Sequence, residues 1–169
     1  QYSIDTNIQH KYAVCDKTKL QEIYLNIVSN AIKYTPNGQA IHVNITETAS
    51  DDKKAWYVFI CEDTGIGMKQ EYLPHIFDEF SREHAATENK VVGTGLGLSI
   101  VKSFVELMDG KIYVESEQGK GTKFTVEIPL EIASEEDVYK KKESEQSVIS
   151  DKSIRKRILL AEDIQMAKN

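Results

Sequence analysis

Three glycines fall within five positions of the stretch KVVGTGLGLSIV (90–101), at Gly93, Gly95 and Gly97. Glycine costs backbone entropy, so such a loop serves a tight turn or a close approach of backbone to a ligand. Apolar residues at helical spacing follow, which places the free N–H groups and positive end of a helix beside the loop. This pattern favours phosphate binding, although a plain helix-entry turn has the same composition.

Two familiar phosphate loops do not fit these residues. A dinucleotide-binding loop needs a third glycine at position 98, where this chain has Leu98, and no strand is expected before Gly93. A Walker A loop needs a Lys-Ser or Lys-Thr pair after its last glycine, which is absent here. Any phosphate bound by this loop must therefore be bound within another kind of fold.

A helix predicted over 17–34 carries a second group of polar residues. Its apolar residues recur at i, i+3, i+4 and i+7 and are expected to cover most of its circumference. The narrow polar stripe that remains consists of Glu22, Asn26, Asn30 and Lys33. A carboxamide oxygen can bind Mg²⁺ and a lysine can pair with phosphate, so this stripe could face a triphosphate. A stripe wetted by solvent is the alternative.

A third candidate is the segment EDTGIG (62–67), at the end of a predicted buried strand over 55–61. The carboxylate of Asp63 can accept a hydrogen bond from an exocyclic amine. Gly65 and Gly67 would let a flat base approach the backbone. A common Asp-Thr-Gly turn is the alternative for this segment alone.

The elements expected around these candidates include both helices and strands. Extended structure is predicted over 2–14, a strand at 41–45, short helical material over 69–80 interrupted at Pro74, and a second helix that ends at Gly110. A hairpin follows, with Phe124, Val126 and Ile128 on one face. The polar segment 81–90 is predicted to be a mobile loop. Both helices and strands are therefore expected in this chain.

Composition limits the function classes. The 169 residues include 40% hydrophobic and 28% charged residues, and the net charge is −6. Such a chain is expected to be soluble, and a general nucleic-acid or anionic-membrane surface is excluded. Cys15 and Cys61 lie far apart, which gives no zinc motif or disulfide framework and fits the cytoplasm. Because the first residue is not Met, we expect a fragment whose parent could be membrane-anchored.

Together and in order, these segments resemble the sensor histidine kinases. LQEIYLNIVSNAIKYTPNG resembles their asparagine box, DTGIGM their first glycine box, FDEF their phenylalanine box, GTGLGLSIV their second glycine box and GKGTKFTVEIPL their closing hairpin. The resemblance implies an ATP-binding catalytic domain over 1–130. The implied fold is the Bergerat-type two-layer α/β sandwich, a mixed β-sheet covered on one face by helices, with a mobile ATP lid.

The resemblance also implies roles for individual residues, with ATP and Mg²⁺ as cofactors. Asn30 is similar to the family's Mg²⁺ ligand and Asn26 to its companion near the phosphates. Lys33 and Tyr34 resemble residues that contact the phosphates and flank the nucleotide. Asp63 matches the aspartate that binds adenine, and Gly65 and Gly67 lie beside the base.

The lid and the pocket floor complete this implied site. Arg82 resembles the arginine that reaches the phosphates from the lid, and together with Asn26 and Lys33 it is assigned to catalysis. Thr122 is assigned to the floor of the adenine pocket. The loop and helix start over the triphosphate are assigned to Gly93, Thr94, Gly95, Leu96, Gly97 and Leu98.

Asn26 favours phosphoryl transfer over hydrolysis, because hydrolytic relatives of this fold have a water-activating glutamate there and an amide is a poor general base. The resemblance implies an acceptor histidine, within a His-Glu or His-Asp motif. None of His10, His42, His75 and His84 is followed by an acid. The acceptor is therefore expected on a separate dimerisation domain, and this chain is expected to be a monomer. The alternatives are a degenerate docking module and an ATPase of the same superfamily.

The C-terminal part changes in composition. Residues 131–156 are expected to form a polar linker rich in Glu, Lys, Ser and Asp, with a partly helical linker as the alternative. Within 157–169, the segment RILLAED resembles the first strand of a receiver domain, with Glu162 and Asp163 as its acidic pair. This suggests a hybrid histidine kinase with a receiver downstream. We expect the apolar strand to be disordered or to pair with a sheet edge.

Overall fold

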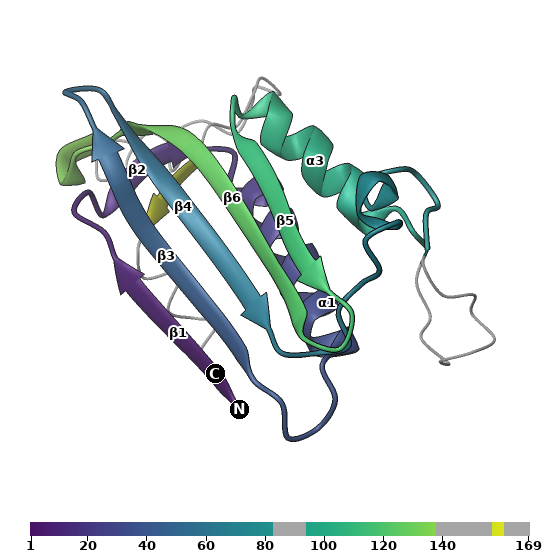
Figure 1. The fold of residues 1–169 in the computed structure, drawn as a ribbon. Helices are drawn as coiled ribbons and strands as arrows, with labels where there is room; N and C mark the ends of the chain where they lie inside the picture. The colour runs from purple at the N-terminus through teal and green to yellow at the C-terminus, as the bar shows by residue number, and fades with distance from the viewer. Residues whose placement is uncertain (83–93, 138–156, 161–169) are drawn as a thin grey trace, which may run out of the picture.

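The computed structural model describes residues 1–82, 94–137 and the backbone of 157–160. Within these residues, seven strands form one sheet, and two α-helices cover one of its faces (Figure 1). The elements are β1 (Tyr2–Asn7), β2 (Tyr12–Cys15), α1 (Lys17–Tyr34), β3 (Ile41–Ser50), β4 (Lys54–Asp63), the 3₁₀ turn η1 (Leu73–His75), α3 (Gly97–Leu107), β5 (Lys111–Glu117), β6 (Gly121–Ile132) and β7 (Arg157–Leu160).

The sheet is mixed, as the sequence predicts. Its order is β1-β3-β4-β6-β2-β7, and β5 pairs with the first part of β6. Only the β1–β3 pair is parallel among the described strands, and the other pairs are antiparallel. The expected two-layer α/β architecture is therefore confirmed.

Helix α1 packs on the sheet through one face only. Its N-cap is Asp16, whose Oδ1 accepts a hydrogen bond from the backbone N–H of Lys19 over 3.1 Å. The buried face consists of Leu20, Ile23, Ile27 and Ala31. Leu25 and Ile32 are 68% and 63% exposed on the outer side. The expected burial of most of the circumference is wrong, because the sheet and α3 contact only part of this helix.

The core lies between the helices and the central strands β4 and β6. Phe124, Val126 and Ile128 are buried on one face of β6, as the alternation predicts. The rings of Tyr24 and Phe59 stack between α1 and β4, with centroids 4.4 Å apart. Each such side chain contributes about 1.5–3 kcal/mol on burial, so this layer holds α1 at a fixed position over β4.

The segment 69–80 forms less helix than the sequence suggests. Only Leu73–His75 makes a 3₁₀ turn, and Pro74 stands in its first turn. Proline is tolerated there because the first N–H groups of a helix have no intrahelical acceptor. Pro74 therefore lies in the first turn of this short element, and the expectation that it interrupts a helix is wrong.

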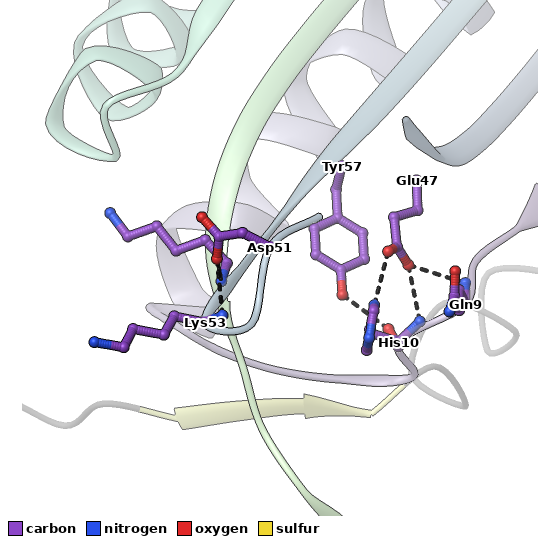
Figure 2. A network of polar contacts seen from close by, with 7 residues as sticks. Gln9, His10, Glu47, Asp51, Lys53 and Tyr57 are labelled. Atoms are coloured by element: carbon purple, nitrogen blue, oxygen red, sulfur yellow. Dashed lines mark hydrogen bonds and ion pairs between the residues drawn. The ribbon is translucent and has the colours of Figure 1, made fainter. Parts of the chain in front are cut away.

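A buried carboxylate fixes the β1–β2 loop against β3 and β4 (Figure 2). The Glu47 side chain is 6% exposed and accepts hydrogen bonds from the backbone N–H groups of Gln9 and His10, over 2.9 and 2.8 Å. Its other oxygen lies 2.7 Å from Nδ1 of His10. The hydroxyl of Tyr57 donates to the His10 carbonyl over 2.8 Å. This network gives His10 a structural role.

The sheet continues beyond residue 130, the expected end of the domain. Strand β6 ends at Ile132, which pairs with Ala13 of β2, and Ala133 is buried. On the other edge of β2, the backbone of β7 pairs antiparallel, with Ala13 opposite Leu159. Pairing with a sheet edge is one of the two outcomes expected for the apolar strand. Glu162 and Asp163 lie outside the described residues.

No helix in the parts of the chain that the structure describes has the length and apolar character needed to cross a membrane.

Candidate functional site

Asp63 ends the central strand β4 and is buried, with 7% exposure. Its Oδ1 accepts a hydrogen bond from the backbone N–H of Gly65 over 2.9 Å. Burial raises the pKa of this carboxyl, and the Gly65 and Thr122 N–H groups and the Thr35 hydroxyl only partly oppose that rise. Burying a carboxylate costs free energy unless it is well paired, so Asp63 marks a candidate site.

Thr35 supplies an unsatisfied polar atom beside this carboxyl. The residue caps the C-terminal end of α1, and its Oγ1 is buried without a hydrogen bond of ordinary geometry to any described residue. It is still close enough to lower the pKa of Asp63. A buried hydroxyl without a partner is rare in native proteins. The pair of Thr35 and Asp63 therefore fits a polar ligand or ordered water placed between α1 and β4.

Gly65 and Gly67 allow the loop after β4 to touch other backbone directly. A Cβ at Gly65 would lie 2.4 Å from the carbonyl oxygen of Tyr34, and one at Gly67 would lie 2.0 Å from that of Glu117. The N–H of Ile66 also donates to the Tyr34 carbonyl over 3.1 Å. Packing alone thus requires both glycines, and contact with a base remains a prediction for them.

Thr122 stands directly opposite Asp63 in the β4–β6 register. Opposite residues in an antiparallel pair project to the same face of a sheet. The Oγ1 of Thr122 lies 3.0 Å from Oγ of Ser116, which stands opposite it on β5. The three side chains therefore form a row across three strands. Ser116 carries no signal in the sequence alone, since only the register of the hairpin brings it opposite Thr122.

The polar stripe of α1 is partly covered. Asn26, Asn30 and Lys33 are half-buried, whereas Glu22 is exposed. Nδ2 of Asn26 donates to the Glu22 carbonyl over 2.8 Å. The Oδ1 of Asn26 lies 2.6 Å from the position that a Cβ of Gly97 would occupy. Asn26 thus lies at the contact of α1 with the start of α3.

Lys33 and Tyr34 end the same helix. The Nζ of Lys33 lies 5.1 Å from the centroid of the Tyr34 ring, within cation–π range. The Tyr34 side chain is 37% exposed, and its carbonyl contacts the loop at Gly65. The structure thus places both residues at the helix end nearest Asp63.

The phenylalanine-rich segment and the glycine segment are joined through backbone. The N–H of Phe80 donates to the carbonyl of Gly95 over 3.0 Å. Both residues have left-handed φ, +61° and +75°. Thr94 Oγ1 accepts from the N–H of Leu96 over 3.4 Å, and Leu98 packs against the core. These contacts hold the start of α3 beside the turn that ends at Phe80.

Two candidate residues stand at the border of the described part. Arg82 is exposed and is the last described residue before 83–93. Gly93 lies inside that undescribed segment, so its assignment to the glycine loop stays a prediction. The phosphate contact assigned to Arg82 also stays a prediction.

A metal site made of protein acids is not present in the described parts of the chain, which contain no cluster of three or more His, Cys, Asp or Glu residues. Mg²⁺ bound with a nucleotide usually takes one or two protein ligands and completes its shell with phosphates and waters. The half-buried amide of Asn30 has the hard oxygen that such an arrangement requires. The residues present therefore fit Mg²⁺ held together with phosphate.

Three comparisons place this geometry among known proteins. The family described as "Histidine kinase-, DNA gyrase B-, and HSP90-like ATPase" matches residues 15–132. The autoinducer 2 sensor kinase/phosphatase LuxQ of Vibrio parahaemolyticus is 40% identical over 116 residues, 68% of this chain. The hybrid signal transduction histidine kinase D of Dictyostelium discoideum is 34% identical over 147 residues, 87% of this chain.

Solved structures show the same fold. The mycobacterial sensor histidine kinase MprB superposes with a TM-score of 0.57 and 25% identity, covering 78% of this chain and 84% of that one. Full-length ShkA in complex with AMPPNP gives a TM-score of 0.57 and 29% identity, covering 79% of this chain and 26% of that one. The chain spans only 13% and 10% of the two curated relatives above. It belongs to the family of histidine kinase-, DNA gyrase B- and HSP90-like ATPases, whose sensor-kinase members it resembles.

Proposed function

We propose that this chain binds Mg-ATP and donates the γ-phosphoryl group to a histidine on a separate dimerisation domain, as part of a two-component phosphorelay. The observation that carries the proposal is the buried carboxylate of Asp63, which lies beside glycine backbone where the end of α1 meets the end of β4. Relatives named as sensor and hybrid histidine kinases, and the ShkA structure with AMPPNP, support it.

At the base end of the site, Asp63 accepts a hydrogen bond from the exocyclic amine of adenine. Its Oδ1 already accepts from Gly65, and a carboxylate has acceptor positions left on both oxygens. Thr122 forms the floor, since it stands opposite Asp63 in the sheet. The unsatisfied hydroxyl of Thr35 supplies a further polar contact for the base or for a water that the base holds.

At the phosphate end, α1 and the start of α3 lie together. Asn30 supplies an oxygen to Mg²⁺, which when bound neutralises part of the phosphate charge. Lys33 leaves the ring of Tyr34 to pair with phosphate, and Arg82 approaches from the lid side. The first N–H groups of α3, behind Gly95 and Gly97, face the phosphates with the positive end of a helix. Catalysis consists of positioning and charge stabilisation.

Transfer to histidine is favoured over hydrolysis by the chemistry of Asn26. Its amide donates to the helix backbone at Glu22 and cannot take a proton from water. In the transfer, the N–P bond to the acceptor imidazole forms as the P–O bond to ADP breaks, with its electron pair leaving on ADP. The imidazole N–H proton passes to the acidic residue of the acceptor motif, which lies outside this chain.

The three described histidines already have local partners. His10 contacts Glu47, His42 contacts Ser3, and His75 contacts Asp78. None of these three histidines is followed in the sequence by the acidic residue of an acceptor motif. We place the acceptor outside this chain, and the protein in the cytoplasm as the kinase portion of a hybrid protein with a receiver downstream.

The test is phosphoryl transfer between separate chains. This chain is incubated with [γ-³²P]ATP, Mg²⁺ and the dimerisation domain of its parent protein. We expect acid-labile, base-stable label on that domain and almost no phosphate release without it. Steady release of phosphate that disappears in Asn26→Ala would contradict the kinase assignment in favour of an ATPase. Absence of nucleotide binding would favour a docking module.

A further inference from the structure

The hydroxyl of Ser116 joins three segments around the candidate base pocket. It accepts a hydrogen bond from the N–H of Met68 over 2.9 Å and donates to the carbonyl of Gly121 over 2.8 Å. It also lies 3.0 Å from Oγ1 of Thr122. Ser116 therefore connects the loop after β4 with the first two residues of β6.

The direction of these hydrogen bonds follows from the number of protons available. A serine hydroxyl has one proton to donate and two lone pairs to accept with. An N–H such as that of Met68 only donates, and a carbonyl such as that of Gly121 only accepts. The Ser116 proton is thus used on Gly121, and the contact with Thr122 requires the Thr122 hydroxyl to donate to Ser116.

This arrangement decides what Thr122 offers to a ligand. Because its proton points to Ser116, only lone pairs of Oγ1 remain for the pocket. Asp63, directly opposite on β4, offers lone pairs as well. Two acceptors side by side match a group with two N–H bonds, such as the exocyclic amine of a 6-aminopurine. A 6-oxo purine would bring a third acceptor against them.

We infer that Ser116 is a positioning residue that fixes Thr122 as a hydrogen-bond acceptor and so helps the site choose 6-amino over 6-oxo purine nucleotides. The inference rests on the proposed function, since it needs the base to lie at Asp63 and Thr122. It concerns a different property, the selectivity for the base, and assigns Ser116 no direct contact with the nucleotide.

A calorimetric test compares a non-hydrolysable ATP analogue with the corresponding inosine triphosphate analogue, which has an oxygen in place of the 6-amino group. We expect the unaltered protein to favour the adenine compound. Ser116→Ala frees the Thr122 hydroxyl to donate, so we expect this preference to fall about five- to tenfold. Thr122→Val should lower it similarly, and the double variant should lose no more than either single one.

Two further variants separate positioning from a general effect on folding. Ser116→Thr keeps the hydroxyl and suits a strand, so we expect it to retain most of the preference. Ser103→Ala is the control, because the Ser103 hydroxyl is exposed and donates to the Ser99 carbonyl within α3. It should leave both affinities unchanged.

Specific results would overturn the inference. An unchanged adenine preference in Thr122→Val would do so regardless of how Ser116→Ala folds, because that variant leaves the Ser116 contacts to Met68 and Gly121 in place. Additive losses in the double variant would show that Ser116 acts independently of Thr122. If the unaltered protein bound neither analogue, the proposed function itself would fail, which is a distinguishable outcome.

Discussion

A Cβ atom built on Gly97, the first residue of α3, would lie 2.6 Å from the Oδ1 atom of Asn26 on α1. No real Cβ approaches an oxygen so closely, so the Asn26 amide can keep this position only because residue 97 has no side chain. The contact links the helix that carries the polar stripe to the helix that follows the glycine loop. It gives the third glycine of the loop a role beyond conformational freedom.

Gly97→Ala is expected to weaken nucleotide binding at least tenfold while leaving stability within about 1 kcal/mol of the original. Alanine is the better helix former, and the clashing atom is the end of a side chain that can rotate. The amide of Asn26 must then leave its position near the phosphates. Calorimetry and urea unfolding measure the two quantities.

Ser103→Ala, on the same helix, is the matched control and should change neither quantity. A Gly97→Ala variant that bound nucleotide as tightly as the original would contradict the assignment of Asn26 and Gly97 to the phosphate end of the site.

Gly119 in the β5–β6 turn and Gly121 at the start of β6 allow the cost of a backbone clash to be compared with the cost of backbone strain. Both have left-handed φ, +83° at Gly119 and +118° at Gly121. A Cβ at Gly121 would lie 1.9 Å from the carbonyl oxygen of Asp63, whereas one at Gly119 would meet nothing within 4 Å. Gly119→Ala should cost about 1 kcal/mol, and Gly121→Ala at least about 4 kcal/mol.

The free energy of unfolding in urea checks this difference. Equal losses in the two variants would mean that φ alone decides the cost and that the backbone contact between Gly121 and Asp63 contributes nothing.

Asp63→Asn is expected to weaken ATP binding without lowering the free energy of unfolding. Burial raises the pKa of Asp63 above its ordinary value of 3.8, so the folded state disfavours the ionised form. A raised folded pKa contributes stability that is present at low pH and is lost as pH rises through that pKa. At neutral pH the asparagine variant should therefore be at least as stable as the original, while its binding of ATP is strongly reduced.

The affinity for ATP should depend on pH in the opposite sense to the stability contribution of Asp63. The ionised carboxylate accepts from the adenine amine, so affinity should fall as pH decreases through the pKa of Asp63. Any residual binding of ATP by the asparagine variant should show no such decrease. Binding in the original protein that stayed constant down to the ordinary aspartate pKa would contradict the role given to this carboxylate.

Glu47→Gln should affect the fold and leave the site unchanged. Burial acts to raise the pKa of Glu47, but hydrogen bonds from the His10 backbone and imidazole and the Gln9 backbone bring it below the usual value. This stability is present above the unfolded-state pKa and is lost as pH falls through the lower folded-state pKa. We expect about 1–3 kcal/mol less stability at neutral pH and an unchanged ATP affinity.

Urea unfolding at neutral and strongly acidic pH checks both parts. A Glu47→Gln variant with weakened ATP binding would show that the β1–β2 loop affects the site. That result would contradict the expectation that Glu47 contributes to stability alone.

Much of the fold was predictable because its signals are local. The apolar period of α1 and the alternation at Phe124, Val126 and Ile128 follow from short stretches of sequence. The exposure of Leu25 and Ile32 was not predictable in this way. It depends on how much of α1 the sheet and α3 cover, which is a property of the tertiary fold.

The candidate site also contains residues that the sequence indicates and residues that only the tertiary fold reveals. Residue type and order predict Asp63, Asn26 and the glycines as candidates. They do not predict Ser116 and Thr35, because their importance comes from one contact across a hairpin and from one hydroxyl left without a partner. The 3₁₀ turn at Pro74 was misassigned because helical composition does not reveal that only one turn forms.

The most direct test of the account is a calorimetric titration of this chain with a non-hydrolysable ATP analogue, with and without Mg²⁺, beside Asp63→Asn and Glu47→Gln. We expect one site with an affinity of about −8 to −5 kcal/mol, tighter with Mg²⁺, lost in Asp63→Asn and retained in Glu47→Gln. No heat in the original protein, or equal heat in it and in Asp63→Asn, would contradict the assignment of adenine to Asp63.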